Sequence, residues 1–248
     1  MIRISAFVGA LVALPAIVAA GGTVADSTSA RAEQTGTLSG TIRFLGEAPD
    51  PVPLSVGGDA EVCAAQSIFD ESLLVDEATL GVQNAVVWLE GVPSAENPVR
   101  IGEIPTLDQK GCRYEPHVLV VRSGQEIHLL NSDGILHNTH TRSTLNRPIN
   151  KAQPGFLKKV AVSFRRPEII EVGCDAHEWM RAWIVVAEHS YYAVTDQTGG
   201  FRFEGVPPGT YTLQVWHEAM GRQNARVTVV ASQRSQVDLE FPFPSSES

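Results

Sequence analysis

The sequence predicts an all-β protein, and two observations support this fold class. Several segments alternate apolar and polar residues with a period of two, as half-buried strands do, and the clearest are 36–45 and 210–217. The chain also contains 21 Gly and 15 Pro, which mark the turns between such strands. Hydrophobic residues make up 43% of the chain, which is ordinary for a globular protein. Its length of 248 residues predicts one large or two small domains.

The first 20 residues predict a secretory signal peptide. Arg3 gives a positive start, residues 4–20 are nearly all apolar, and Val18-Ala19-Ala20 ends this run with small residues suited to cleavage. A transmembrane anchor is the alternative, but the apolar run barely reaches spanning length and no basic cluster follows it. Residues 21–35 are small and polar and predict a flexible leader. We therefore expect a periplasmic or secreted protein that is not inserted in the membrane after cleavage.

Strands are expected on both sides of an acidic segment in the first third of the chain. The segment 36–45 predicts one strand and 84–89 predicts another. The tract between them, 59–77, is acidic and predicts solvated loops. The formal net charge of the whole chain is −9, which argues against nucleic acid as the main partner.

The segment 173–180, Gly-Cys-Asp-Ala-His-Glu-Trp-Met, concentrates soft metal ligands. Cys174, His177 and Met180 supply a thiolate, an imidazole and a thioether, each three residues from the next. Strand-like segments at 168–172 and 182–186 flank this loop, so its start, middle and end can converge on one point. Two His, one Cys and a long axial Met are typical of a copper electron-transfer centre. The alternative is a buried Cys in a β-turn with an incidental His and a core Met.

A second motif, His137-Asn138-x-His140, lies upstream and would supply the missing imidazole. Together with the Cys-x-x-His-x-x-Met loop, it resembles the cupredoxins, the small blue copper proteins, and most closely those of the amicyanin type. The resemblance extends from about residue 113 to 187. It also includes the segments Tyr114-Glu115-Pro116 and 118–127, and Asn131.

The resemblance implies a Greek-key cupredoxin β-sandwich over residues 104–188. It implies His137, Cys174 and His177 as equatorial copper ligands and Met180 as the axial ligand. It favours His137 over His140, because in the family an Asn directly follows the ligand His and ties the two ligand loops together. Asn138 fits that second-shell role. In the family the loop His faces solvent, so the resemblance makes His177 the port for electrons, with Trp179 beside it as an apolar contact for a partner.

Three cysteines are present, Cys63, Cys112 and Cys174. In an exported protein disulfides persist, and a disulfide between Cys63 and Cys112 would leave one thiol, the one in the ligand loop. An unpaired thiol is a liability in an oxidising compartment unless a metal holds it as thiolate. The rival pairing of Cys112 with Cys174 would abolish the site, and the sequence does not decide between them.

Residues 141–167 are strongly basic. Seven Lys or Arg residues and no Asp or Glu lie in this segment: Arg142, Arg147, Lys151, Lys158, Lys159, Arg165 and Arg166. One interpretation is a basic rim that attracts an acidic redox partner over a long range. The other is a surface that neutralises the acidic tract at 59–77.

The last third of the chain predicts further strands separated by Gly-rich and Pro-Pro-Gly turns. The segments 194–203, 206–217, 226–230 and 236–241 carry this pattern, which resembles the carboxypeptidase regulatory-like, prealbumin-like β-sandwich. These strands are too few for two packed sheets, and the opening strands of that module resemble 40–54 and 84–90. We therefore predict a discontinuous sandwich of residues 36–100 and 189–243 with the copper domain inserted. A tandem of two domains is the alternative.

The function expected from these patterns is one-electron transfer at a single copper, with no enzymatic activity. Phosphate-loop, paired-carboxylate and Ser-His-Asp patterns do not stand out in the sequence. A second hypothesis is periplasmic copper binding and delivery, in which the second sandwich recognises a partner. A third is a structural sandwich whose metal loop no longer binds copper.

Overall fold

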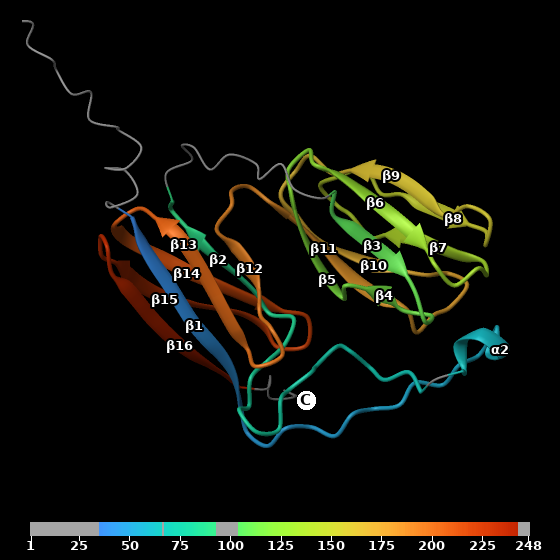
Figure 1. The fold of residues 1–248 in the computed structure, drawn as a ribbon, viewed down its shortest axis with the longest axis horizontal. Coiled ribbons are helices and arrows are strands. Elements are labelled where there is room, and N and C mark those ends of the chain that lie inside the picture. The colour runs from blue at the N-terminus through green and yellow to red at the C-terminus, as the bar shows by residue number, and fades with distance from the viewer. Residues whose placement is uncertain (1–34, 66, 93–103, 243–248) are drawn as a thin grey trace, which may run out of the picture.

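The computed structural model describes residues 35–65, 67–92 and 104–242. The expected signal peptide (1–20) and all but the last residue of the expected leader (21–35) lie outside these residues. The regular structure is almost entirely β-strand, which confirms the predicted fold class. Its strands form two β-sandwiches that lie side by side (Figure 1). None of the described helices has the length and apolar character needed to cross a membrane.

The first sandwich packs a five-stranded sheet against a four-stranded one. The larger sheet has the order β5 (Val118–Arg122), β11 (Arg181–Ala187), β10 (Glu168–Gly173), β7 (His137–Thr141) and β8 (Asn150–Gln153). The smaller sheet has the order β4 (Tyr114–Glu115), β3 (Thr106–Gln109), β6 (Glu126–Asn131) and β9 (Lys159–Ser163). Parallel pairing of β11 with β5 and of β3 with β6 brings together strands that are distant in sequence.

The core of the first sandwich follows from the period-two pattern of its strands. In β6, Ile127 and Leu129 point inward and are fully buried. Ile170 and Val172 do the same in β10 and belong to the same apolar cluster. Each such side chain contributes about 1.5–3 kcal/mol by leaving water. Cys174 and Met180 belong to this cluster too, so the ligand loop continues the core.

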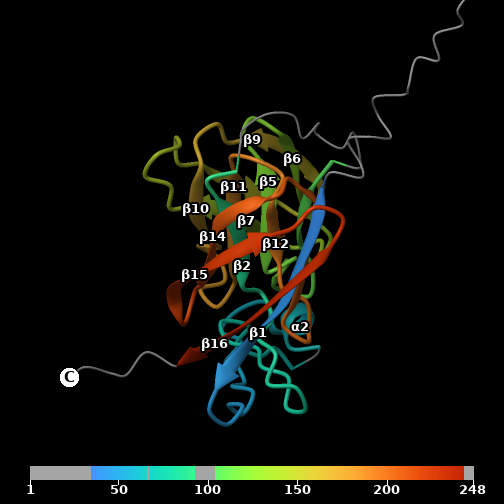
Figure 2. The same cartoon turned by 90° about the vertical axis from the view of Figure 1, so that its left-hand side faces the viewer.

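The second sandwich takes strands from both ends of the described chain. One sheet has the order β13 (Gly200–Val206), β1 (Gly36–Leu45) and β16 (Arg234–Pro242). The other has the order β12 (Tyr192–Val194), β2 (Val86–Glu90), β14 (Gly209–His217) and β15 (Gly221–Val229). Figure 2 shows β1 running beside β16, with which it pairs in parallel. Gly40 permits this pairing, because a Cβ there would lie 1.7 Å from the carbonyl oxygen of Val237.

An apolar cluster joins the two sandwiches. Val118 and Val185 of the first sandwich bury against Val86 of the second. The rings of Trp183 and Trp216 meet edge to face with their centroids 4.8 Å apart across this junction. Both rings are half-buried, and their contact adds to the apolar packing between the two sandwiches.

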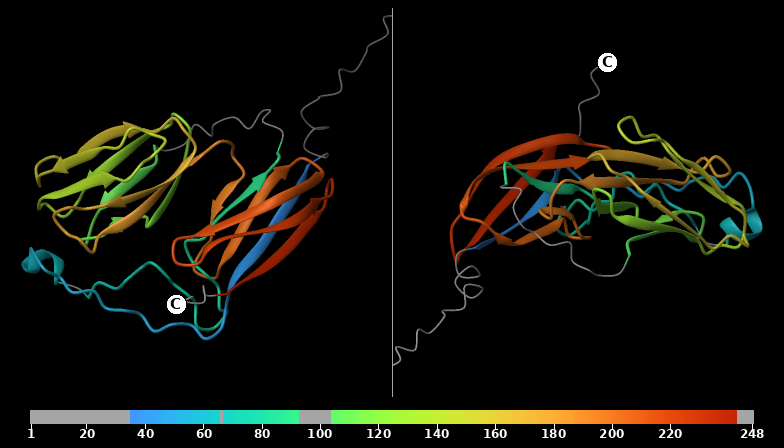
Figure 3. Two further views of the ribbon diagram at one scale, coloured as in Figure 1. Left: turned by 180° about the vertical axis from the view of Figure 1, so that it is seen from behind. Right: turned by 90° about the horizontal axis from the view of Figure 1, so that it is seen from above.

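A long segment between β1 and β2 contributes no strand to the four sheets, and we call residues 46–82 the strap. It runs along one edge of the molecule to the far end of the first sandwich, where its short helix α2 (Ala60–Cys63) lies (Figures 1 and 3). The strap contains the acidic tract, 59–77, that we expected to form solvated loops. Much of it is loop, but Cys63 and Ile68 are buried in the core of the first sandwich.

Candidate metal centre

The ligand loop is closed by the hairpin of β10 and β11. These strands pair antiparallel up to the pair Gly173 and Arg181, so residues 174–180 form the connection between them. Within it, the Met180 amide donates to the His177 carbonyl oxygen at 2.9 Å and tightens the turn. Cys174 therefore starts the loop and Met180 ends it, both against the core, as the spacing of three residues predicts.

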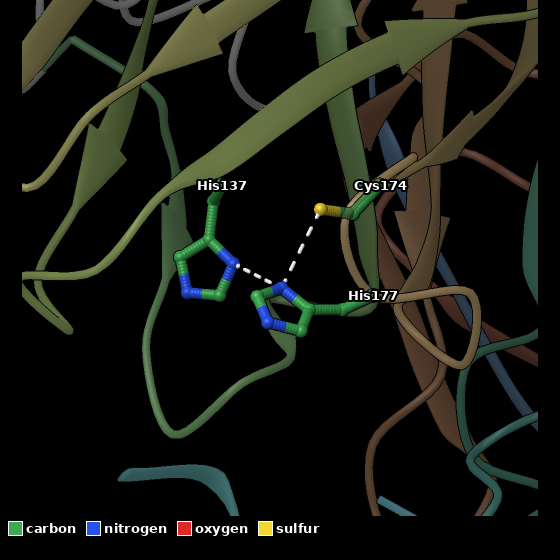
Figure 4. A group of neighbouring side chains, drawn as sticks. All are labelled: His137, Cys174 and His177. Carbon is green, nitrogen blue, oxygen red and sulfur yellow. Dashed lines mark hydrogen bonds between the residues drawn. The ribbon is translucent and has the colours of Figure 1, made fainter. Parts of the chain in front are cut away.

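His137 reaches this loop because β7 pairs with β10. It is the first residue of β7, at the end of the strand that lies nearest the loop. Its Nδ1 lies 2.9 Å from Nδ1 of His177, which in turn lies 3.8 Å from Sγ of Cys174 (Figure 4). The three ligand atoms lie within 4.8 Å of one another. His137, Cys174 and His177 are 0%, 4% and 1% exposed, so the cluster is closed to bulk water.

A carboxylate holds the outer nitrogen of each imidazole. Nε2 of His137 lies 2.9 Å from Asp133, and Nε2 of His177 lies 3.0 Å from Asp59. An ionised carboxylate can only accept, so in each neutral ring Nε2 carries the proton and Nδ1 presents a lone pair to the centre of the cluster. Two such lone pairs 2.9 Å apart repel unless a cation lies between them. The donor set therefore fits a metal ion bound by two Nδ1 atoms and one thiolate.

Burial also favours the neutral ligand form of His137. It lowers the pKa of the imidazole below its ordinary value of 6.5, although the hydrogen bond that His137 donates to Asp133 acts in the opposite direction. The nearby ring of His177 acts in the same direction as burial. A neutral His137 can bind a metal without first losing a proton.

Asn138 links the two ligand segments. Its Oδ1 accepts from the Asp175 amide at 2.7 Å, and its Nδ2 donates to Asp175 Oδ2 at 3.0 Å and to Asn150 Oδ1 at 2.8 Å. The Cys174 thiol lies 3.3 Å from Asn138 Oδ1, and the Asn138 amide donates to Sγ at 3.4 Å. Tyr114 adds a further link, since its hydroxyl lies 2.6 Å from the Asn138 carbonyl oxygen and 2.9 Å from that of Gly173.

The remaining candidate ligands lie as follows. Met180 is 2% exposed and packs in the apolar cluster that contains Cys174, so its axial role remains a prediction. His140 points elsewhere, because its Nδ1 bonds to Asp175 Oδ1 at 2.9 Å and its side chain is 38% exposed. His137 is thus the histidine of this motif that faces Cys174.

The cysteines divide into one disulfide and one free thiol. Cys63 and Cys112 are bonded, and Cys174 is free and buried. The rival pairing of Cys112 with Cys174 does not occur. Sγ of Cys112 also lies within 4.8 Å of ligand atoms of Asp133 and His137, but a disulfide sulfur supplies no thiolate.

His177 does not face solvent, although the resemblance implied that it does. Asp59 of the strap covers its Nε2, and the ring is 1% exposed. Trp179 is half-buried, and its Nε1 donates to the Cys112 carbonyl oxygen at 3.0 Å. His177 is buried because the tip of the strap lies at this end of the first sandwich (Figure 1) and brings Asp59 against the ring.

Sequence patterns do not predict the two carboxylates at the imidazoles. Asp133 lies four residues before His137, next to Gly134, and this turn near a ligand was the available local signal. Asp59 lies 118 residues from His177 in sequence and carries no local signal at all.

The fold and the site thus define a two-sandwich β protein with a buried cluster of two His and one Cys that could hold a metal ion. Residues 181–242 match the family model of the carboxypeptidase regulatory-like domain. This match begins in β11, which pairs in the first sandwich, and continues through β16. No curated protein matches the chain.

Several solved structures similar to the chain are copper proteins of the cupredoxin class. The reduced Cu(I) form, at pH 4, of a single-residue mutant of amicyanin is 18% identical over 41% of this chain and 98% of that one, with a TM-score of 0.32. A purple cupredoxin from Nitrosopumilus maritimus is 16% identical over 34% and 99%, with a TM-score of 0.29. A copper-containing nitrite reductase from Thermus scotoductus SA-01 is 20% identical over 40% of this chain, with a TM-score of 0.32. The chain spans about a quarter, 27%, of that reductase.

Proposed function

We propose that the protein carries single electrons on one copper ion bound by His137, Cys174 and His177, with Met180 as a weak axial ligand. The observation that supports this most directly is the convergence of one Sγ and two Nδ1 atoms in a buried cluster. Thiolate, two imidazoles and an axial thioether are the ligand set of copper electron-transfer sites. Bound there, copper would alternate between Cu(I) and Cu(II).

The protein's contribution is a site that stays the same in both oxidation states. The ligands come from paired strands and from the loop that joins β10 to β11. Asn138 and Tyr114 tie these segments together, and two carboxylates fix the imidazole rings. Such outer partners orient the ligands and tune the metal. A rigid ligand cage reduces the rearrangement that each electron transfer requires.

A carrier fits this site better than an enzyme does. A catalytic metal keeps one coordination position open for water or substrate. Here four protein side chains would fill the coordination shell, and the three that converge are buried. We therefore infer a non-enzymatic role in an exported, periplasmic or secreted protein.

We further propose an acidic redox protein as the partner. All seven basic residues of the segment 141–167 are exposed. Within the described part of the chain, the one that forms an ion pair is Arg142, with Glu171. None of the seven is paired with the acidic tract of the strap in that part of the chain, so these charges are available to attract an acidic surface.

Copper handling is the second candidate, and the cover over His177 favours it. A carrier must pass electrons through a ligand near the surface, whereas a storage or delivery protein needs a closed site. The two functions differ in redox behaviour. A carrier cycles reversibly between two copper states, and a handling protein binds Cu(I) and gives no intense visible absorption.

The test is titration of the purified mature protein with Cu(II), followed by visible absorption and reduction. We expect one equivalent of copper, an intense absorption from the thiolate, and reversible one-electron bleaching. Cys174→Ala should abolish the band, and His137→Ala should weaken binding by at least tenfold. His140→Ala is the matched control, because that ring lies outside the cluster, and it should change neither. If Cys174→Ala kept the spectrum and the affinity, the ligand assignment would be wrong.

A further inference from the structure

The two arms of the strap are joined at its middle, and its tip is anchored to the first sandwich. Its two arms are joined by hydrogen bonds from the Leu54 amide to the Ile68 carbonyl oxygen and from the Asp70 amide to the Val52 carbonyl oxygen, both at 2.8 Å. Beyond them, the Cys63–Cys112 disulfide fixes the tip to the first sandwich. The strap is therefore a tethered hairpin whose tip has one defined position.

That position places a carboxylate on a candidate metal ligand. Asp59 directly precedes α2, and its carbonyl oxygen accepts from the amides of Val62 and Cys63 at 2.9 Å each. Its backbone is left-handed, with φ 49°, which turns the chain sharply at this residue. Its Oδ2 lies 3.0 Å from Nε2 of His177. The Asp59 side chain is 51% exposed and that of His177 is 1% exposed, so the carboxylate stands between the imidazole and solvent.

The disulfide connects this contact to the opposite side of the site. The amide of Cys112 donates at 2.9 Å to Asp133 Oδ2, the same oxygen that lies 2.9 Å from Nε2 of His137. Cys63, at the other end of the disulfide, belongs to the helix that Asp59 begins. One covalent link therefore supports both carboxylates that orient the two imidazoles.

We infer that the strap is a covalently clipped cover for the metal centre and that Asp59 is a positioning residue for His177. Asp59 holds the proton of His177 on Nε2, directs Nδ1 inward, and excludes solvent and partner surfaces from this ring. While the clip is closed, a partner does not touch His177. The consequences for bound copper rest on the proposed function, but the covering of His177 does not.

The first test uses the metal-free protein, so it stays valid if copper does not bind. Diethyl pyrocarbonate modifies accessible imidazole nitrogens, and mass spectrometry locates the modified residues. In the native protein His140 should react while His177 stays protected. Asp59→Ala should expose His177 and raise its rate of modification at least tenfold. Modification of His177 in the native protein as fast as that of His140 would overturn the inference.

The matched control is Glu61→Ala, which removes another exposed carboxylate from the strap two residues away. It should leave His177 protected. Asp59→Asn should retain partial protection, because an amide oxygen still accepts from Nε2. Cys63→Ala combined with Cys112→Ala should expose His177 as Asp59→Ala does. If that double variant fails to fold, Asp59→Ala alone tests whether the strap covers His177, because it leaves the Cys63–Cys112 disulfide in place.

The second test measures how tightly the cover retains copper. The copper-loaded protein is mixed with excess chelator, and the loss of visible absorption is timed. Removal of an outer partner of a metal-bound His costs about 10–100-fold in metal affinity. We expect Asp59→Ala to release copper faster by a factor in that range and to shift the visible band, and Glu61→Ala to match the native protein. Equal release by all three proteins would show that Asp59 does not position His177. A native protein that binds no copper would instead refute the proposed function and leave the first test to decide the cover.

Discussion

Asn138→Ala tests whether the two ligand segments depend on one amide side chain. Asn138 is 6% exposed, and its side chain makes three hydrogen bonds of 3.0 Å or less: it accepts from the Asp175 amide and donates to the Asp175 carboxylate and to Asn150. A net contribution of about 1 kcal/mol per bond predicts a loss of roughly 3 kcal/mol in the free energy of unfolding. Freed from these bonds, the loop should bind copper about 10–100-fold more weakly.

The assay combines urea unfolding of the metal-free protein, followed by tryptophan fluorescence, with a competitive copper titration. Asn224→Ala is the matched control, because Asn224 is exposed on β15 in the second sandwich, and its effect should stay within about 0.5 kcal/mol. A variant that unfolds like the native protein and keeps both copper affinity and the visible band would refute the role of Asn138.

Three further predictions concern stability. Tyr114→Phe removes the hydroxyl that reaches the carbonyl oxygens of Asn138 and Gly173, and it should cost about 1–2 kcal/mol in urea unfolding while leaving the visible band in place. Trp216→Ala removes the edge-to-face contact with Trp183 and should separate the unfolding of the two sandwiches into two calorimetric transitions, whereas a single unchanged transition would contradict the junction. Burial lowers the pKa of His217 to about 4 from 6.5. As the pH falls, His217 therefore takes up its proton in the unfolded chain before it does so in the folded protein. Stability should therefore fall by up to about 3 kcal/mol between pH 6.5 and pH 4, and His217→Gln should remove that part of the decline in urea titrations.

Local patterns were sufficient to predict the hairpin that carries the candidate ligands. Cys174, His177 and Met180 lie on one hairpin connection, so their spacing alone brings them near one another. The predicted segments 168–172 and 182–186 agree with β10 and β11 to within one residue at each end. Their β-branched and aromatic residues made these strands visible in the sequence.

Short strands and distant contacts were not predictable in this way. The strands β8 and β9 are four and five residues long and lie in the basic segment, where charged residues mask the alternation. Helix α2 has only four residues. Asp59 before it is a residue type that favours helix starts, but its backbone is left-handed and its side chain caps no amide of the helix. The contact of Asp59 with His177 depends on the tertiary path of the strap, which no periodicity encodes.

The resemblance to cupredoxins was informative about the cluster but not about its surroundings. It implied His137, Cys174 and His177, and the structure brings their ligand atoms together. It also implied a solvent-facing His177, which is wrong here because Asp59 of the strap lies against Nε2 of that ring and leaves it 1% exposed. Additions to a domain change what its surface residues can contact, even where its internal residues keep their places.

The most direct test of a copper centre of this composition is X-ray absorption at the copper edge on both oxidation states of the loaded protein. Our account predicts a short copper–sulfur bond and two imidazole nitrogens in Cu(II) and in Cu(I), with little change in bond lengths between them. A spectrum without a sulfur scatterer, or one in which the imidazoles dissociate on reduction, would contradict it.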